Sequence, residues 1–362
     1  MSLPKQVLVL TMFDVSRLDR AMAVRPHNLC TSLQGLTPTE MVAGGWMPRR
    51  REILRYLLRG GLRRTRAVYV EASTTTATET DLLFLALLRL ARVPILIFIP
   101  DAYQRFPAIF HRSGLKVKIL DWGWRRSIAA YQRLADRLFF PSPGLAACFD
   151  NRPPIDTLPP GGPAGREPAS VTCDPPTVVY IGATSHRYGS DLLLDAMEQV
   201  VTSHPTARCR FITADASYLD GHPSRHAPWL AVERRSFDEL PEVMRSATLA
   251  VIPLRSNPYN DLAMPVKLFD CMAFGLPQVV TRCCDMAALV KETDTGLVVQ
   301  DSVDDLAQGI IHLLQDRDLA SRLGHNAYQA VQTSHSWGHR AAQILAAIEQ
   351  IEQEQRDAHP AR

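Results

Sequence analysis

Short runs of apolar residues recur along the whole chain, and stretches with helical periodicity separate them. A short run of Val, Ile and Leu that is bounded by polar residues is typical of a strand buried on both faces of a parallel sheet. The runs lie at residues 7–11, 67–71, 95–99 and 137–141, and then at 177–182, 208–213, 230–232, 248–253, 278–281 and 296–299. Their alternation with helices predicts an α/β fold built from doubly wound parallel sheets.

A segment rich in proline and glycine, residues 151–176, separates the two sets of predicted strands. It holds eight prolines and three glycines, a composition that disfavours both helix and strand. Because 362 residues exceed what one core usually supports, we expect two Rossmann-like domains, at residues 1–150 and 177–335, facing each other across a cleft. A long helical pattern at 336–362 is expected to pack back on the N-terminal domain.

One helical pattern in the second half places charged residues near the predicted start of a helix. Pro265 suits the first turn, and Gly275 suits the end of the helix. The unpaired N–H groups of a helix start and the charge of Lys267 favour a phosphate, and Asp270, one turn further on the same face, is able to accept sugar hydroxyls. Residue types alone leave a second interpretation open, in which the helix is ordinary packing and Lys267 is a solvated charge.

Charge is distributed unevenly between the halves. Residues 1–150 carry 22 Lys and Arg against 11 Asp and Glu, whereas the remaining residues carry 18 against 26. Many of the arginines surround an apolar helical pattern at residues 49–66, which is typical of a helix on an anionic membrane surface or of a solvated helix that covers a sheet. We expect no binding of nucleic acid, because the basic cluster lacks interleaved aromatic residues.

The cysteines and the apolar segments indicate a cytoplasmic protein. Seven cysteines are scattered without a C-x-x-C pair, which fits neither a zinc site nor a disulfide framework. No secretion signal precedes the first strand, and Arg89, Arg92 and Pro94 interrupt the longest apolar region, so it predicts a helix and a strand and not a membrane span. We expect a cytoplasmic chain, in solution or peripheral on the inner face of the membrane.

The second half also carries an ordered set of motifs. They are Y-I-G-A-T-S-H-R from Tyr180, I-P-L-R-S-N-P-Y-N-D from Ile252, A-M-P-V-K-L-F-D-C-M-A-F-G-L-P from Ala263, T-G-L-V-V from Thr295 and H-S-W from His335. This set resembles the donor domain of the GT-B glycosyltransferases, most of all family 4 and the xanthan-type glucuronosyltransferases. The first half matches more loosely, through V-Y-V-E-A-S and P-I-L-I-F-I-P-D-A-Y. The resemblance implies the GT-B architecture and transfer of a sugar from a nucleoside-diphosphate sugar to a hydroxyl acceptor.

By this resemblance, Lys267 contacts the donor diphosphate, and Asp270 takes the place of the second glutamate of the family 4 acidic pair. Leu262 stands where the first glutamate is expected, with Asp261 one residue earlier. The glucuronosyltransferase relatives also lack the full pair and keep the Val-Lys element, here Val266 and Lys267. The stereochemical course, retaining or inverting, therefore stays open.

Two loops of the second half complete the expected donor site. After strand 177–182, Gly182 lets backbone N–H groups approach a phosphate, and Arg187 is able to neutralise it, although one glycine and one arginine after a strand also occur by chance. After strand 248–253, Tyr259 or Asn260 is able to reach the donor.

In the first half, Asp101 follows the third predicted strand, where a carboxylate at the carboxyl end of a sheet can take the proton of an acceptor hydroxyl. The other interpretation is a carboxylate that caps the following turn. Glu71 ends another predicted strand and is the second carboxylate candidate. Arg17, Arg20 and Arg25, in the loop after the first strand, are candidates for binding an anionic group of the acceptor or donor.

These observations predict a hexosyl- or glucuronosyltransferase of glycan, exopolysaccharide or glycolipid biosynthesis that needs no cofactor. A UDP-sugar is the favoured donor and a GDP-sugar the second choice, and the acceptor is a glycan, a lipid-linked molecule or a small molecule. No D-x-D-like motif in a convincing setting is present, so no metal site is expected. Two alternatives remain: a nucleotide-sugar epimerase of GT-B fold, and a subunit that binds nucleotide sugar without turnover.

Overall fold

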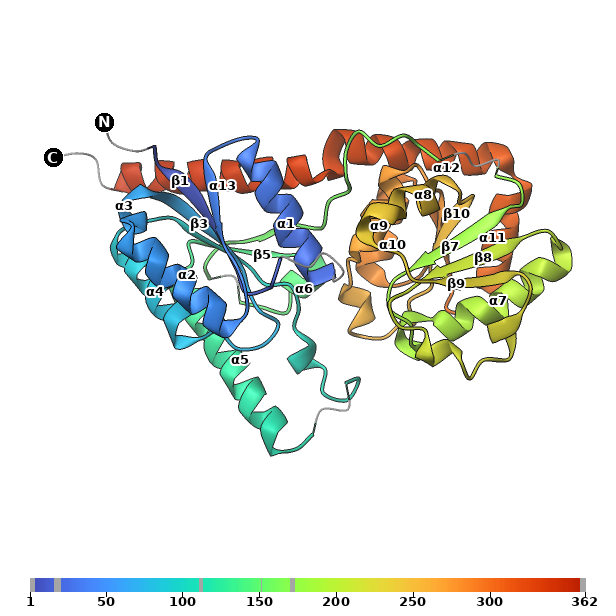
Figure 1. The fold of residues 1–362 in the computed structure, drawn as a ribbon, viewed down its shortest axis with the longest axis horizontal. Coiled ribbons are helices and arrows are strands. Elements are labelled where there is room, and N and C mark those ends of the chain that lie inside the picture. The colour runs from blue at the N-terminus through green and yellow to red at the C-terminus, as the bar shows by residue number, and fades with distance from the viewer. Residues whose placement is uncertain (1–3, 16–20, 111–112, 151, 170–172, 359–362) are drawn as a thin grey trace. The chain divides into compact units, whose positions relative to one another are not determined.

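A computed structural model describes residues 4–15, 21–110, 113–150, 152–169 and 173–358, and the chain divides into two compact units (Figure 1). The first unit comprises Met1–Pro159 and Trp337–Arg362, and the second comprises Pro160–Ser336. Each unit contains a six-stranded sheet of its own. No helix in the described ranges is both long enough and apolar enough to cross a bilayer.

The first sheet has parallel neighbours throughout. Its strand order is β2 (Thr39–Val42), β1 (Gln6–Thr11), β3 (Thr65–Glu71), β4 (Ile95–Phe98), β5 (Arg137–Phe140) and β6 (Ile155–Thr157). The apolar residues of the four middle strands are buried, as expected of strands that are covered on both faces.

Helices cover both faces of this sheet (Figure 1). They are α1 (Ala21–Gln34), α2 (Trp46–Leu58), α3 (Gly61–Arg64), α4 (Glu79–Leu90), α5 (Leu115–Leu134), α6 (Pro143–Ala146) and α13 (Trp337–Ala358). Because parallel crossovers are right-handed and the order reverses after β2, α1 lies on one face of the sheet and α2, α4 and α5 lie on the other. The C-terminal helix α13 packs against α1.

Two polar contacts join α13 to the first sheet. The guanidinium of Arg66 in β3 binds both carboxylate oxygens of Glu352, at 2.9 and 2.8 Å. The Gln343 amide donates a hydrogen bond to the carbonyl oxygen of Thr157 at 2.8 Å. The last helix of the chain therefore belongs to the first unit, although it follows the second unit in the sequence.

The second sheet is parallel as well. Its order is β12 (Gly296–Val299), β11 (Gln278–Thr281), β10 (Leu249–Ile252), β7 (Thr177–Ile181), β8 (Arg208–Ile212) and β9 (Leu230–Glu233). The helices are α7 (Ser190–Ser203), α8 (Leu240–Arg245), α9 (Val266–Ala273), α10 (Cys284–Thr293), α11 (Val303–Gln315) and α12 (Arg317–Ala330).

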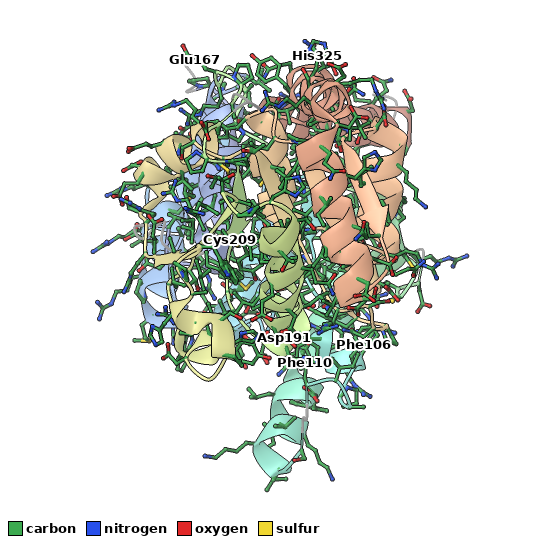
Figure 2. All side chains as sticks on the ribbon, turned by 90° about the vertical axis from the view of Figure 1, so that its right-hand side faces the viewer. Phe106, Phe110, Glu167, Asp191, Cys209 and His325 are labelled. Atoms are coloured by element: carbon green, nitrogen blue, oxygen red, sulfur yellow. The ribbon has the colours of Figure 1, made fainter. Side chains whose placement is uncertain are left out.

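The core of the second unit consists of two apolar clusters, which share the alternating residues of the strands. On β7, Val178 and Tyr180 belong to one cluster and Val179 to the other. Cys209 of β8 belongs to the first cluster and lies in the interior (Figure 2). Successive side chains of a strand point to opposite faces, so both faces of the sheet are buried.

All ten strands expected from the apolar runs are present, and the α/β class with doubly wound parallel sheets is confirmed. The two strands that the pattern missed, β2 and β6, are the edge strands of the first sheet, which are short and mix polar with apolar residues. Strand β6 lies within the segment that we expected to resist strand formation, so the predicted domain boundary at residue 150 is too early. An edge strand pairs on one side only and therefore tolerates neighbouring prolines.

Candidate functional site

The candidate site lies in the second unit, where the loops after β7 and β10 meet the first turn of α9. Helix α9 begins at Val266, and Pro265 precedes it as the N-cap in an extended conformation. The first turn of α9 has neither an acidic residue nor a side-chain cap. Its N–H groups therefore keep the partial positive charge of a helix start. At the other end, Gly275 adopts a left-handed conformation, with φ of +64°, and ends the helix as expected.

Lys267, the second residue of α9, is a half-buried cation. Its ammonium lies 4.3 Å from the ring centre of Tyr180 and 5.9 Å from that of Tyr188. Across the described residues, no carboxylate pairs with it. Burial lowers the pKa of Lys267 to about 8, although Tyr188 and Cys271 act in the opposite direction. An anion beside Lys267 would supply the charge that the protein does not.

Gly182, directly after β7, lies against Lys267. A Cβ atom added at Gly182 would be 3.2 Å from the Lys267 Nζ atom, and the φ angle of Gly182 is +129°. A side chain at this position would therefore be strained and would crowd the ammonium. The glycine leaves space beside the cation, while its own N–H donates a hydrogen bond to the carbonyl oxygen of Ile212 at 2.9 Å.

Asp270 lies one turn after Lys267 on α9, and the two do not form an ion pair within the described part of the chain. Burial raises the pKa of the Asp270 carboxyl to about 7. Near neutral pH this carboxyl is therefore partly protonated, and it is able both to donate and to accept a hydrogen bond.

Arg187 joins Lys267 at the ring of Tyr188 and also lies over the ring of Tyr259. The guanidinium of Arg187 lies 4.4 Å from the ring centre of Tyr188 and 5.4 Å from that of Tyr259. It also donates a hydrogen bond to the Tyr188 hydroxyl at 2.9 Å. Two cations thus share one aromatic ring. The structure thus brings two of the predicted donor residues, Lys267 and Arg187, together at Tyr188, which the sequence reasoning missed.

Asn260 holds the two loops together. It is 1% exposed, and its amide donates hydrogen bonds to the carbonyl oxygens of Arg187 at 3.0 Å and Arg255 at 2.7 Å. The backbone N–H of Arg255 donates to the same Arg187 oxygen at 3.2 Å. The sequence makes Asn260 a candidate donor contact, and in the structure its amide group fixes the backbone at Arg187 and Arg255.

Gly189 permits this close approach of the loops. Its φ angle is +67°, and a Cβ atom there would lie only 1.7 Å from the carbonyl oxygen of Pro253. The glycine after H-R-Y can be seen in the sequence, but the residue whose closeness requires a glycine here, Pro253, is 64 positions further along the chain.

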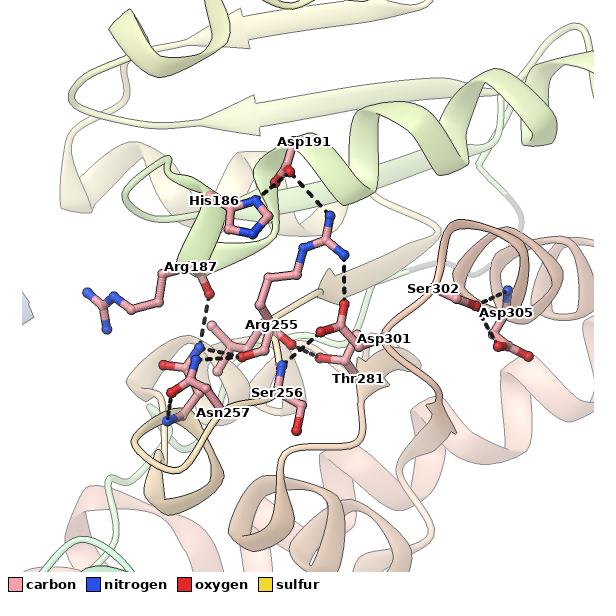
Figure 3. A network of polar contacts seen from close by, with 12 residues as sticks. His186, Arg187, Asp191, Arg255, Ser256, Asn257, Thr281, Asp301, Ser302 and Asp305 are labelled. Atoms are coloured by element: carbon pink, nitrogen blue, oxygen red, sulfur yellow. Dashed lines mark hydrogen bonds and ion pairs between the residues drawn. The ribbon is translucent and has the colours of Figure 1, made fainter. Parts of the chain in front are cut away.

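A network of charged side chains links the loop after β10 to the loop after β7 and the start of α7 (Figure 3). Arg255 binds Asp301 at 2.9 Å and Asp191 at 3.2 Å, and Asp191 also contacts the His186 ring at 2.8 Å. Burial acts to raise the pKa of Asp191, but the hydrogen bonds from His186 and Arg255 outweigh it and hold the pKa below its ordinary value. Asp191 is therefore a charged anchor near the start of α7.

In the first unit, Glu71 and Arg25 are paired with each other. Glu71 is 1% exposed and accepts hydrogen bonds from Arg25 Nε at 3.0 Å and from the Tyr69 hydroxyl at 2.7 Å. Arg25 also donates to the carbonyl oxygen of Leu158 and stacks on the Phe98 ring at 3.6 Å. Glu71, the second carboxylate candidate, is therefore the buried counter-ion of Arg25.

The remaining candidates of the first unit have different outcomes. Asp101 is half-buried after β4, and its carboxylate accepts a hydrogen bond from the N–H of Ala102 at 2.6 Å, which agrees with its alternative role in the turn. Arg17 and Arg20 lie outside the described residues.

Comparisons with known proteins show which families this chain is similar to. Residues 175–316 match the family model described as "Glycosyl transferases group 1". Two curated proteins of Methanocaldococcus jannaschii, uncharacterised glycosyltransferases MJ1178 and MJ1607, are 25% identical over 150 residues and 22% identical over 188 residues. These matches cover 41% and 50% of this chain and 41% and 46% of the relatives. The chain thus matches less than half the length of these curated relatives.

Solved structures share the fold along almost the whole chain. Sucrose-phosphate synthase from Thermosynechococcus elongatus has a TM-score of 0.66 at 15% identity and covers 97% of this chain and 100% of its own. HepE from Anabaena, in complex with UDP, has a TM-score of 0.65 at 14% identity and covers 96% and 100%. The predicted GT-B architecture and the predicted resemblance to GT-B glycosyltransferases are confirmed.

Proposed function

We propose that this protein is a glycosyltransferase that moves a sugar from a nucleoside-diphosphate sugar to a hydroxyl acceptor, with the donor bound in the second unit. The observation that carries this proposal is the ammonium of Lys267, which has no counter-ion in the described part of the chain and lies beside Gly182 at the uncapped start of α9. A diphosphate would satisfy both the cation and the helix start.

A UDP-sugar is the proposed donor. HepE from Anabaena, which shares the fold, has been solved with UDP and with UDP-glucose. Two further groups of the site fit a sugar nucleotide: Arg187 supplies a second cation near Lys267, and Asp270 supplies a carboxyl for sugar hydroxyls. A hexosyl or glucuronosyl group is the proposed sugar.

Catalysis would be mainly electrostatic. As the bond between the anomeric carbon and the diphosphate breaks, negative charge grows on the departing phosphate. Lys267, Arg187 and the start of α9 would stabilise that charge more in the transition state than in the ground state. Because these groups neutralise the leaving group, we propose that transfer needs no divalent metal.

Asp101 is the proposed general base for the acceptor hydroxyl. Removing the proton as the oxygen attacks avoids a positively charged intermediate and is typically worth about 10²- to 10⁴-fold in rate. A base of this kind implies inversion at the anomeric carbon. The aliphatic Leu262, where family 4 enzymes carry an acid, is consistent with a course different from theirs.

The acceptor is proposed to be anionic or lipid-linked, in glycan, exopolysaccharide or glycolipid biosynthesis at the cytoplasmic face of a membrane. The support is the positive charge of the first 150 residues, which contain 22 Lys and Arg but only 11 Asp and Glu. The transferase test is a panel of UDP- and GDP-sugars, first for stabilisation of the protein against heat and then for release of UDP or GDP in the presence of acceptors.

An epimerase is the second candidate, because a putative UDP-N-acetylglucosamine 2-epimerase from Listeria monocytogenes has the same fold, with a TM-score of 0.56. Incubation with donor alone separates the two functions. A changed sugar without acceptor would support the epimerase, and product formation that requires an acceptor would support the transferase. Donor binding without turnover in either assay would support a non-catalytic subunit.

A further inference from the structure

Exposed apolar side chains are concentrated on three helices of the first unit. Among the described residues, thirteen large apolar side chains are exposed, and eleven of them lie on α2, α4 and α5. We call these eleven the apolar face: Trp46, Met47, Leu54, Leu58, Leu83, Leu87, Leu90, Leu115, Ile119, Leu120 and Trp122. The second unit contributes only Tyr218 to the thirteen.

The three helices form one layer on one side of the first sheet (Figure 1). Helix α4 contacts both α2 and α5. A buried ion pair fixes α2 to α4, because the Arg49 guanidinium binds both carboxylate oxygens of Asp81 at 2.7 Å. Since the inner sides of the helices cover the sheet, their outer sides make a single surface.

Helix α4 is apolar on its inner and its outer side. Phe84, Leu85 and Leu88 are buried against the sheet, whereas Leu83, Leu87 and Leu90 point outward and are 66%, 43% and 81% exposed. A helix that is apolar all round normally has both sides covered. One side of α4 is therefore without its cover.

Among the described residues, the first two turns of α5 contain no fully buried side chain. Its buried residues begin only at Gly123, while Leu115, Ile119 and Trp122 repeat at helical spacing and are 74%, 59% and 65% exposed. At the bottom of Figure 2 these turns extend beyond the other elements of the first unit. Two turns of an apolar helix in water are not stabilised by tertiary packing.

The positive charge of α2, α4 and α5 indicates which kind of partner covers the apolar face. Helices α2, α4 and α5 carry ten Lys and Arg against four Asp and Glu, and the exposed cations include Arg50, Arg51, Lys116 and Lys118. A second copy of the chain docked through the same face would bring two positive surfaces together. An anionic bilayer attracts the cations and also accepts the apolar side chains, with tryptophan suited to the interface.

We propose that the apolar face docks on the surface of a bilayer that contains anionic lipid, with its leucine and tryptophan side chains inserted at the level of the headgroups. The sequence indicated one basic helix at 49–66, whereas the docking surface spans three helices, and α5 supplies its protruding end. Docking of this kind has an apolar component, so part of it persists at high salt. The proposal rests on the first unit alone and is independent of the donor site.

The test is sedimentation of the full chain with extruded vesicles of phosphatidylcholine, with and without phosphatidylglycerol. Wild type is expected to bind the anionic vesicles, and raising the salt should weaken but not abolish binding. The variant Leu58→Gln, Leu90→Gln, Trp122→Gln changes three exposed residues and should weaken binding roughly tenfold or more. The control variant Leu36→Gln, Tyr218→Gln changes exposed apolar residues outside the face and should bind like wild type.

Thermal unfolding and UDP binding are measured on the same variants, and both should be unchanged. Equal vesicle binding by wild type and the triple variant would overturn the proposal. Absence of vesicle binding by wild type would overturn it as well. A wild-type dimer in sedimentation equilibrium that the triple variant abolishes would also overturn it, because the apolar face would then bind a second copy of the chain. If wild type does not bind UDP, that result contradicts the proposed donor site and leaves the vesicle-binding result for the apolar face as it stands.

Discussion

The ammonium of Lys267 lies 4.3 Å from the ring centre of Tyr180, so a cation at the start of α9 rests on an aromatic ring of the adjacent strand β7. Tyr180 is fully buried, and its hydroxyl donates a hydrogen bond to the carbonyl oxygen of Ala183. The ring is therefore fixed and holds the ammonium near Gly182. This contact offsets part of the cost of a poorly solvated charge but supplies no counter-ion.

Replacing Lys267 by Met should stabilise the fold and abolish donor binding. At pH 7 the lysine is charged in both the folded and the unfolded chain, and its burial costs free energy because the folded pKa, about 8, lies below the ordinary 10.5. The variant should be more stable by about 1–2 kcal/mol after solvent screening. The gain should shrink as pH rises from 8 to 10.5, because the lysine then becomes neutral in both states.

The measurements for this variant are urea unfolding at pH 7 and pH 10 and calorimetric titration with UDP. Lys291→Met is the matched control, since Lys291 is an exposed lysine on α10 of the same unit, and it should change neither quantity. A Lys267→Met protein that binds UDP like wild type would remove Lys267 from the donor site.

Asn260→Ala should impair the donor site through the loops that Asn260 joins. The change removes two hydrogen bonds of a buried amide and should cost about 1–3 kcal/mol of stability. Because the Arg187 carbonyl then keeps only the hydrogen bond from the N–H of Arg255, the loop is held less firmly, and the affinity for UDP should fall roughly tenfold. Asn326→Ala, which removes two side-chain hydrogen bonds to Asp294 elsewhere in the same unit, is the control. Full UDP affinity in Asn260→Ala, despite lower stability, would show that the loops do not depend on this side chain.

Gly189→Ala should destabilise the second unit by about 2 kcal/mol or more, because the residue has a left-handed backbone and its Cβ would meet the Pro253 oxygen. Gly221→Ala should be nearly neutral, since a Cβ there meets nothing within 4 Å and its φ is not left-handed. Urea unfolding of both variants is the measurement. Equal free energies of unfolding for Gly189→Ala and Gly221→Ala would contradict the close packing of the loop at Gly189 against Pro253 at the end of β10.

Asp101→Asn should lower turnover by about 10²- to 10⁴-fold if the carboxylate is the general base, while the affinity for UDP stays the same. Steady-state kinetics with the best donor and acceptor, together with UDP titration, measures both quantities. Asp150→Asn, which changes an exposed carboxylate of the same unit, serves as the control. Turnover near wild type in Asp101→Asn would leave the carboxylate only its role in the turn with Ala102.

The sequence predicts those features that depend on neighbours in the chain. Runs of Val and Ile revealed the buried strands, and a lysine after Pro265 revealed the charged helix start. It did not reveal contacts between distant segments: Asn260 reaches a carbonyl 73 residues away, and Glu71 finds its partner Arg25 46 residues away. The sequence predicted a helix where α4 lies, but it cannot show which leucines of that helix the protein itself covers.

Proton uptake on UDP binding tests the central claim, a diphosphate site at Lys267, most directly. At pH 8 the free lysine is about half protonated, since its pKa is about 8, and a bound diphosphate raises that pKa and completes the protonation. Titration calorimetry in two buffers of different ionisation enthalpy should give an uptake of about half a proton per UDP. Lys267→Met should show no uptake and little binding. UDP binding without proton uptake at pH 8, and with equal affinity in Lys267→Met, would contradict the account.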